Sequence, residues 1–185
     1  MQMNLTRRSL LSGIAAGPIL LGSKRSAQAN SVGTDRAKRF PNLVYRNQEF
    51  EARELDQLKG TVSFVYMWAS WCPICADDLL NIQWYWDKYQ ANPKFSLVVL
   101  NFLEPYETGL AWGKARKFTL PFSNSGIGSR NTPTGKTADG SYTFPLYTPQ
   151  FFILDQNRIV REYTSRKRNA GDDVNRLLQK MLAEV

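Results

Sequence analysis

The chain has only two cysteines, Cys72 and Cys75, which are two residues apart and directly follow an apolar, β-prone run at 61–68. This order predicts a helix that begins at the first cysteine. Pro73 suits the first helical position, because an N–H group there would have no partner within the helix. The unpaired N–H groups and the positive dipole end of such a helix favour the thiolate of Cys72. The spacing therefore indicates redox chemistry, with Cys72 as the nucleophile.

A structural disulfide and a metal site are the other common uses of two close cysteines. A disulfide that closes a four-residue ring restrains the unfolded chain by only about 2 kcal/mol, against about 4.7 kcal/mol for a ring of roughly 100 residues. Zinc would need further ligands, and the chain has no histidine and no third cysteine. Copper delivery lacks its usual imidazole ligand for the same reason. We therefore expect no bound metal and no cofactor.

The N-terminal residues follow the order of an export signal. Arg7 and Arg8 precede a weakly apolar stretch at 10–21, and Ala27-Gln28-Ala29 supplies small residues for cleavage before Asn30. This order resembles a twin-arginine signal. Twelve such residues are too few to span a bilayer core about 30 Å thick, so we expect removal of residues 1–29, a periplasmic location and no stable membrane span. A disordered basic tail is the alternative.

The charge of the chain depends on this segment. Removal of residues 1–29 takes away four basic residues and no acids, so the net charge falls from +8 to +4. The remaining chain has the length of one domain. A basic group remains at Arg158, Arg161 and 166–168, but no nucleic-acid motif accompanies it. We expect this group to form a solvated face and the protein to bind no nucleic acid.

Hydrophobic patterns predict a flexible leader at 30–39 and one domain at 40–185, in which strands and helices alternate. Such alternation favours a parallel sheet core with helical crossovers. The segment 123–143 is rich in small polar residues and has no periodicity, which suits either a mobile surface loop or a substrate-facing flap. The predicted strands are 43–45, 61–68, 95–102, 150–154 and 158–163, the predicted helices are 73–89, 110–118 and 172–182, and 51–58 is a polar turn or short helix.

Two sequence runs suggest a family. Trp-Ala-Ser-Trp-Cys-Pro-Ile-Cys at 68–75 and Tyr-Thr-Pro-Gln-Phe-Phe-Ile-Leu-Asp at 147–155, together with the order of elements, resemble the TlpA/ResA-like branch of the thioredoxin superfamily. The resemblance implies an α/β, thioredoxin-like fold with a central mixed sheet flanked by helices. It also implies that Pro149 is cis beside the cysteine pair and that the backbone of Thr148 pairs with substrate. An ordinary trans proline at the start of a strand is the alternative.

The chain departs from thioredoxin near the cysteines. Thioredoxins carry a buried Asp six residues before the first cysteine, where this chain has Tyr66. TlpA/ResA-like proteins place an acid three residues after the second cysteine, which is Asp78 here. Asp78 would accept the proton of Cys75 if burial raises the pKa of its carboxyl group. Alternatively, Asp78 only stabilises the helix dipole.

These observations predict an exported thiol–disulfide oxidoreductase that reduces disulfides of periplasmic proteins. By resemblance, a membrane electron-transfer protein would supply its electrons. A disulfide oxidase or isomerase resembling DsbA is the enzymatic alternative, and a redox-gated peptide-binding module is the non-enzymatic one. The predicted catalytic residues are Cys72, Cys75 and Asp78, and the predicted substrate-binding residues are Trp71, Pro73, Thr148 and Pro149.

Overall fold

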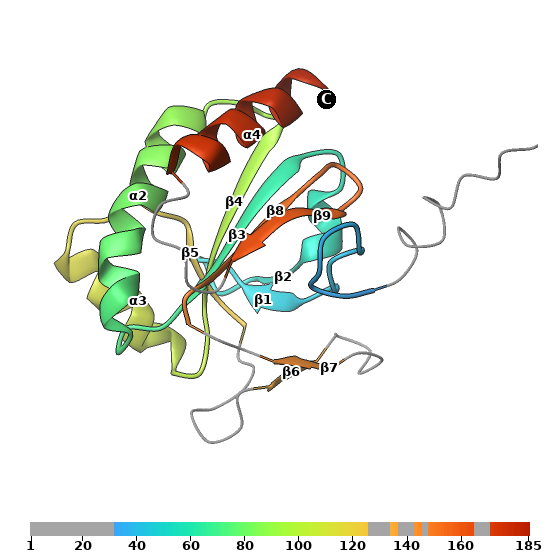
Figure 1. Ribbon diagram of the computed structural model, residues 1–185. Helices are drawn as coiled ribbons and strands as arrows, with labels where there is room; N and C mark the ends of the chain where they lie inside the picture. Colours follow the sequence, from blue (N-terminus) through green and yellow to red (C-terminus); the bar gives the residue numbers. More distant parts are fainter. Residues whose placement is uncertain (1–31, 126–133, 137–142, 146–147, 165–170) are drawn as a thin grey trace, which may run out of the picture.

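A seven-stranded mixed sheet forms the centre of the fold (Figure 1). The computed structural model describes residues 32–125, 134–136, 143–145, 148–164 and 171–185. Three strands, β3, β4 and β5, run parallel, and the other pairings in the sheet are antiparallel. The strands, in spatial order, are β2 (Ala52–Glu54), β1 (Val44–Arg46), β5 (Phe122–Asn124), β4 (Phe95–Asn101), β3 (Val62–Trp68), β8 (Gln150–Leu154) and β9 (Val160–Thr164). The predicted thioredoxin-like fold with a mixed sheet is confirmed.

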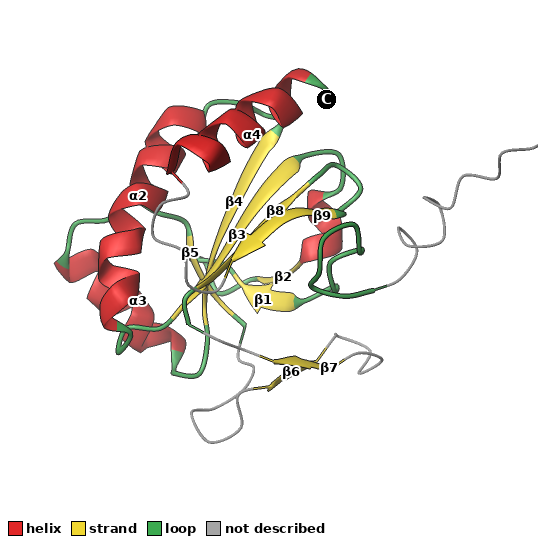
Figure 2. Cartoon of the chain, in the orientation of Figure 1, coloured by secondary structure: helices red, strands yellow, loops and turns green. Residues whose placement is uncertain are grey.

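Helices cover one face of this sheet, and the chain before β3 covers the other (Figure 2). All seven residues of β3 are buried, and their side chains alternate between the two faces. Phe64, Tyr66 and Trp68 belong to the core beneath the helices, whereas Val65 and Met67 belong to the core on the opposite face. The helices are α2 (Pro73–Tyr89), α3 (Tyr106–Ala115) and α4 (Gly171–Ala183).

Most predicted elements lie within a few residues of the observed ones, and α2 and β8 have the predicted bounds. The predicted helix 110–118 was placed too late. Helix α3 begins after Pro105, its N-cap residue, and ends before Lys117, whose φ of 59° is left-handed. The first residue of the helix, Tyr106, is buried and lies four residues before Leu110, where the predicted helix began.

Two regions expected to lack strands contain them. The polar stretch 51–58 holds strand β2 and a 3₁₀ helix, η1 (Leu55–Leu58). The segment 123–143 overlaps β5 and a separate two-stranded sheet of β6 (Thr134–Lys136) and β7 (Thr143–Pro145). The interpretation of its remainder, as loop or flap, lies outside the described residues.

Ordered structure begins before Phe40, within the stretch predicted as a flexible leader. The N–H of Gly33 donates to the carbonyl of Arg39, and the N–H of Ala37 donates to the carbonyl of Val160. The N–H of Val160 in turn donates to the carbonyl of Lys38. The N-terminal segment is therefore attached to the first residue of β9, while residues 1–31 lie outside the described part of the chain.

Arg158 corrects the prediction of a solvated basic face. Its side chain is 1% exposed, makes an ion pair with Asp56 of η1, and donates to the carbonyl oxygen of Phe40. Burial, and secondarily the charge of Arg39, lowers the pKa of Arg158 to about 10. Arg161 does lie at the surface and pairs with Asp155 at 2.6 Å. The other basic residues of the predicted face, 166–168, lie outside the described residues.

Candidate active site

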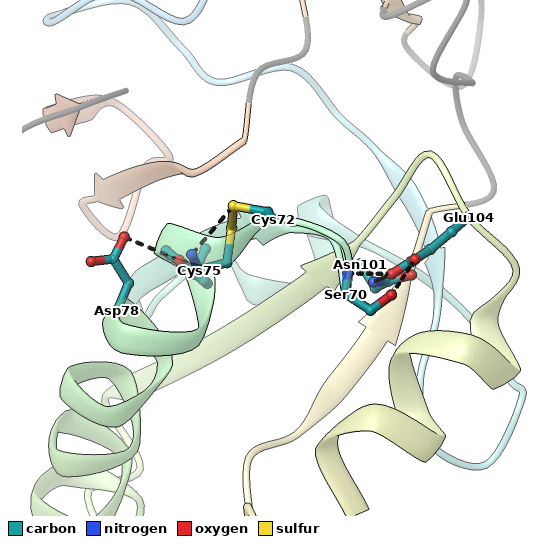
Figure 3. Close-up of a disulfide and its surroundings, with 7 residues drawn as sticks. Ser70, Cys72, Cys75, Asp78, Asn101 and Glu104 are labelled. Atoms are coloured by element: carbon teal, nitrogen blue, oxygen red, sulfur yellow. Dashed lines mark hydrogen bonds between the residues drawn. A yellow bond between two sulfur atoms is a disulfide. The ribbon is translucent and has the colours of Figure 1, made fainter. Parts of the chain in front are cut away.

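Cys72 and Cys75 form a disulfide at the start of α2, directly beyond the C-terminal end of β3 (Figure 3). Cys72 is the N-cap residue of the helix, and Pro73 takes the first helical position, as predicted. The sulfur of Cys72 accepts a hydrogen bond from the N–H of Cys75 at 3.3 Å. The N–H of Cys75, which also donates to the carbonyl oxygen of Cys72, therefore points at this sulfur, where it would stabilise a thiolate.

The two cysteine residues differ in their exposure to solvent. Cys72 is 5% exposed, whereas Cys75 is completely buried. Exposed side chains surround the pair: Trp71 precedes it, and Pro73 and Ile74 lie between the cysteines. A molecule that approaches the disulfide from solvent would therefore meet Cys72 first, within an apolar border.

Thr148 and Pro149 lie at the same edge of the sheet as the disulfide. Their peptide bond is cis, as predicted. They immediately precede β8, which runs antiparallel to β3 and pairs Gln150 with Met67 near the C-terminal end of that strand. Thr148 is half-buried and Pro149 is buried. The topology thus brings both residues to the end of β3 from which the cysteine loop leaves.

Asp78 interacts with Tyr66, the residue that stands where thioredoxins carry a buried Asp. The Tyr66 hydroxyl donates to Oδ2 of Asp78 at 3.3 Å. Burial and the neighbouring Asp78 charge raise the pKa of Tyr66 above its ordinary value, so this phenol stays a hydrogen-bond donor. Asp78 is half-buried. The helix dipole acts most strongly in the first turn of α2, and Asp78 lies beyond that turn.

Sequence reasoning missed a polar network on the other side of the cysteine loop. Glu104 accepts hydrogen bonds from Ser70 and from Asn101, the last residue of β4 (Figure 3). The sequence patterns identified Asn101 only as part of the buried strand 95–102, and Ser70 only as part of the cysteine motif at 68–75. A polar residue at the C-terminal end of an apolar parallel strand is the signal that could have found this network, because sites gather at that edge.

The described residues contain no cluster of side chains suited to bind a metal ion. No group of three or more Cys, Asp or Glu side chains there is arranged to hold a metal ion. Within the same part of the chain, no helix is both long and apolar enough to cross a membrane.

Comparisons with known proteins agree with the fold and the disulfide. The Redoxin family model matches residues 35–180. No curated protein matches the chain. Among solved structures, a candidate thiol:disulfide interchange protein DsbE from Chlorobium tepidum superposes with a TM-score of 0.64 at 18% identity, covering 81% of this chain and 99% of that one.

Two further structures have the same fold. A candidate protein disulfide isomerase from Bacteroides thetaiotaomicron has a TM-score of 0.64 at 20% identity, covering 83% of this chain and 95% of its own. StoA from Bacillus subtilis has a TM-score of 0.54 at 19% identity, covering 76% and 97%. With its family model and its Cys-x-x-Cys disulfide, this chain belongs to the Redoxin family, as a thiol–disulfide oxidoreductase of the thioredoxin-like fold.

Proposed function

We propose that this protein is exported and reduces disulfide bonds of proteins outside the cytoplasm, with Cys72 as the attacking sulfur. The observation that carries this proposal is the asymmetry of the pair. Cys72 is the more exposed cysteine and caps the start of a 17-residue helix, whereas Cys75 is fully buried one turn later. A helix N-terminus stabilises a thiolate, and the thiolate is the nucleophile in exchange.

The reaction proceeds in two exchange steps. The Cys72 thiolate attacks one sulfur of the substrate disulfide, which forms a mixed disulfide and releases the other substrate sulfur as a thiolate. The Cys75 thiolate then attacks Cys72, which closes the Cys72–Cys75 disulfide and releases the second substrate thiolate. Two electrons pass to the substrate, and its two released thiolates take up two protons, which balance the two that Cys72 and Cys75 lost when they ionised. A dithiol of a membrane electron-transfer protein would restore the reduced pair.

Asp78 is proposed to take the proton of Cys75 before the second step. Residues three apart on a helix lie on the same face, so Asp78 follows Cys75 by one turn. The Tyr66 hydrogen bond connects the Asp78 carboxylate to β3, the strand that leads into the cysteine loop. A carboxylate held beside a buried thiol can accept its proton, and positioned proton transfer contributes about 10²- to 10⁴-fold to a rate.

Substrate binding is proposed for Trp71, Pro73, Thr148 and Pro149. Trp71 and Pro73 are exposed beside Cys72, which suits contact with an unfolded or extended polypeptide. Thr148 precedes the first residue of β8 at the same sheet edge, and its backbone could pair with substrate as a strand does.

Trapping of a mixed disulfide tests which cysteine attacks the substrate and which one resolves the mixed disulfide. Replacement of Cys75 by Ser leaves the attack intact and blocks resolution, so the variant should accumulate a mixed disulfide with a protein substrate. The matched variant Cys72→Ser should accumulate none. Full turnover by Cys75→Ser would contradict the assignment, and tight peptide binding that survives loss of both cysteines would favour a binding module.

The reduction potential of the Cys72/Cys75 pair tests whether the protein reduces or oxidises its substrates. We expect a value near or below about −270 mV, the thioredoxin range, when residues 30–185 are equilibrated against a reference dithiol. A value near about −120 mV, as in DsbA, would make the protein a disulfide donor. Pro73 between the cysteines is the feature that keeps this oxidase or isomerase alternative open.

A further inference from the structure

The carboxylate of Glu104 is held by three neutral donors beside the cysteine loop (Figure 3). The N–H of Ser70 donates to Oε1, and the hydroxyl of Ser70 donates to Oε2, both at 2.6 Å. Nδ2 of Asn101 also donates to Oε1. Both oxygens of Glu104 are therefore engaged, two of the three donors belonging to one residue of the loop.

Asparagine residues at the ends of two strands hold Glu104 in place through hydrogen bonds. Asn101 ends β4 and is 1% exposed, and Asn124 ends β5 and is 7% exposed. Nδ2 of Asn124 donates to Oδ1 of Asn101 at 3.0 Å and to the carbonyl oxygen of Glu104 at 3.1 Å. This arrangement satisfies Oδ1 of Asn101 and leaves its Nδ2 group to donate to Glu104. The network is thus anchored in the parallel part of the sheet.

Two backbone features make room for the network. Leu103, the residue before Glu104, has a φ of 64°, a left-handed conformation that is unfavourable for a residue with a side chain. A Cβ atom at Gly109 of α3 would lie 2.6 Å from Cγ of Asn101, so only glycine leaves space for this amide. A strained residue and a required glycine both serve the placement of Asn101 and Glu104, which points to a function for them.

Ser70 connects the network to the attacking sulfur. It lies inside the turn that the N–H of Cys72 closes by donating to the carbonyl of Ala69 at 3.1 Å. The disulfide joins Cys72 to Cys75 and so restrains the chain that follows this turn, whereas the hydrogen bonds of Ser70 to Glu104 restrain the turn itself and do not depend on the disulfide bond.

We propose that Glu104 is a positioning residue for thiol–disulfide exchange: through Ser70 it holds the 69–72 turn, and so keeps the Cys72 sulfur at the start of α2 when the pair is reduced. This assignment rests on the proposed role of Cys72 as the attacking sulfur. Glu104 acts through hydrogen bonds, so its side-chain geometry, more than its charge, determines the effect.

Glutamine at position 104 separates geometry from charge. In Glu104→Gln, the amide oxygen still accepts from the Ser70 N–H and from Asn101, and the amide NH₂ donates to the Ser70 hydroxyl, which changes from donor to acceptor. All three hydrogen bonds survive without the charge. In Glu104→Ala, all three are lost.

The test uses the full chain with Cys75→Ser, so that only Cys72 reacts. The second-order rate of its reaction with oxidised glutathione is measured from pH 4 to pH 9, which yields the thiol pKa and the rate of the thiolate separately. We expect Glu104→Ala to lower the rate at which the Cys72 thiolate reacts with oxidised glutathione about ten-fold. Misplacement of a reacting group by a fraction of an ångström reduces rates by such factors. We expect Glu104→Gln to stay within two-fold of the parent, and Glu107→Ala, an exposed acid in the first turn of α3, to do the same.

Several results would overturn the proposal. An unchanged rate in Glu104→Ala would remove the positioning role, and an equal loss in Glu104→Gln or Glu107→Ala would assign the effect to charge. If Glu104→Ala does not fold, Ser70→Ala decides: it removes one of the three hydrogen bonds, and we expect it to slow the thiolate about three-fold, whereas no change would contradict the proposal. Full exchange by Cys72→Ser in the presence of Cys75 would instead refute the underlying assignment of the attacking sulfur.

Discussion

The two ends of strand β3 hold charged side chains in different ways. At the C-terminal end, the half-buried carboxylates of Asp78 and Glu104 accept hydrogen bonds from hydroxyl and amide groups on either side of the disulfide. At the N-terminal end, the fully buried guanidinium of Arg158 faces the carboxylate of Asp56. Uncharged donors keep a carboxylate in place without cancelling its charge, whereas an ion pair cancels it. We infer that the first end serves the chemistry and the second serves stability.

The largest effect is expected at the reactive end. Cys72→Ser should reduce disulfide exchange to background, since it removes the attacking sulfur. The same change should lower the free energy of unfolding by no more than about 2 kcal/mol, because the lost ring is only four residues long. Insulin reduction and urea unfolding of the same sample measure both quantities. A variant that loses its fold together with its activity would break the comparison.

The opposite result is expected at the other end. Asp56→Ala removes the partner of the buried Arg158 guanidinium and should cost about 3 to 5 kcal/mol of stability, the usual loss when one member of a buried pair is removed. Its exchange rate, measured at a temperature where it remains folded, should match that of the parent. Arg158→Met should cost less, because the Asp56 carboxylate is about one-third exposed and also contacts Arg39 and Lys59.

A surface ion pair supplies the control for this change. Arg176 and Asp173 pair in α4 with side chains that are 74% and 77% exposed. Asp173→Ala should change stability by about 0.5 kcal/mol or less, since exposed pairs are well hydrated before and after the change. A loss as large as that of Asp56→Ala would show that burial is not the cause.

Asp78→Asn should act on the second exchange step. If Asp78 accepts the proton of Cys75, the rate at which Cys75 resolves a mixed disulfide at pH 7 should fall about 100-fold. The rate at which Cys72 attacks should change little. Stopped-flow resolution of a preformed mixed disulfide, followed across pH, separates the two steps. Equal losses in both would indicate a general electrostatic effect of the carboxylate.

The effect expected for Tyr66→Phe is small, and it depends on pH. Burial raises the pKa of Tyr66 above 10, so the folded protein keeps the phenol proton at a pH where the unfolded chain releases it. The unfolded state then binds fewer protons, and the contribution of Tyr66 to stability falls as pH rises above 10. At pH 8, loss of its hydrogen bond should cost about 1 kcal/mol.

Urea unfolding of the parent and of Tyr66→Phe between pH 8 and pH 11 measures this effect. We expect the stability difference between the two proteins to shrink as pH rises. Arg158, whose pKa is lowered to about 10, changes stability in the opposite direction, but it is present in both proteins and cancels in the difference. A pH-independent difference would indicate that Tyr66 ionises equally in both states.

The sequence predicted the parts of the site that are local in the chain. The position of Cys72 at the start of a helix follows from the apolar run before it and from Pro73 after it. The cis bond before Pro149 came from the family resemblance, and the structure confirms it. The hydrogen bond joins Tyr66, identified as a departure from thioredoxin, to Asp78, identified as the acid typical of TlpA/ResA-like proteins, but sequence alone gave no reason to connect them.

Contacts between distant segments were beyond the sequence patterns. Glu104 lies 34 residues from Ser70, and their hydrogen bonds depend on the pairing of β3 with β4. Arg158 was expected at the surface because it belongs to a local group of basic residues, which usually forms a solvated face. Its partner Asp56 is far away in the chain, in a stretch that looked like a polar turn, and only the assembled sheet brings the two together.

The attachment of the N-terminal segment to Val160 also affects how copies of this protein meet in solution. Strand β9 is a sheet edge, and an open edge offers its N–H and C=O groups to strands of other molecules. Lys38 and Ala37 already occupy both backbone groups of Val160, at the start of that edge. The opposite edge, β2, is only three residues long and carries Arg53 and Glu54, which discourages pairing by charge and brevity. A chain shortened to begin at Phe40 would lose the protection at Val160 and should associate more readily through β9.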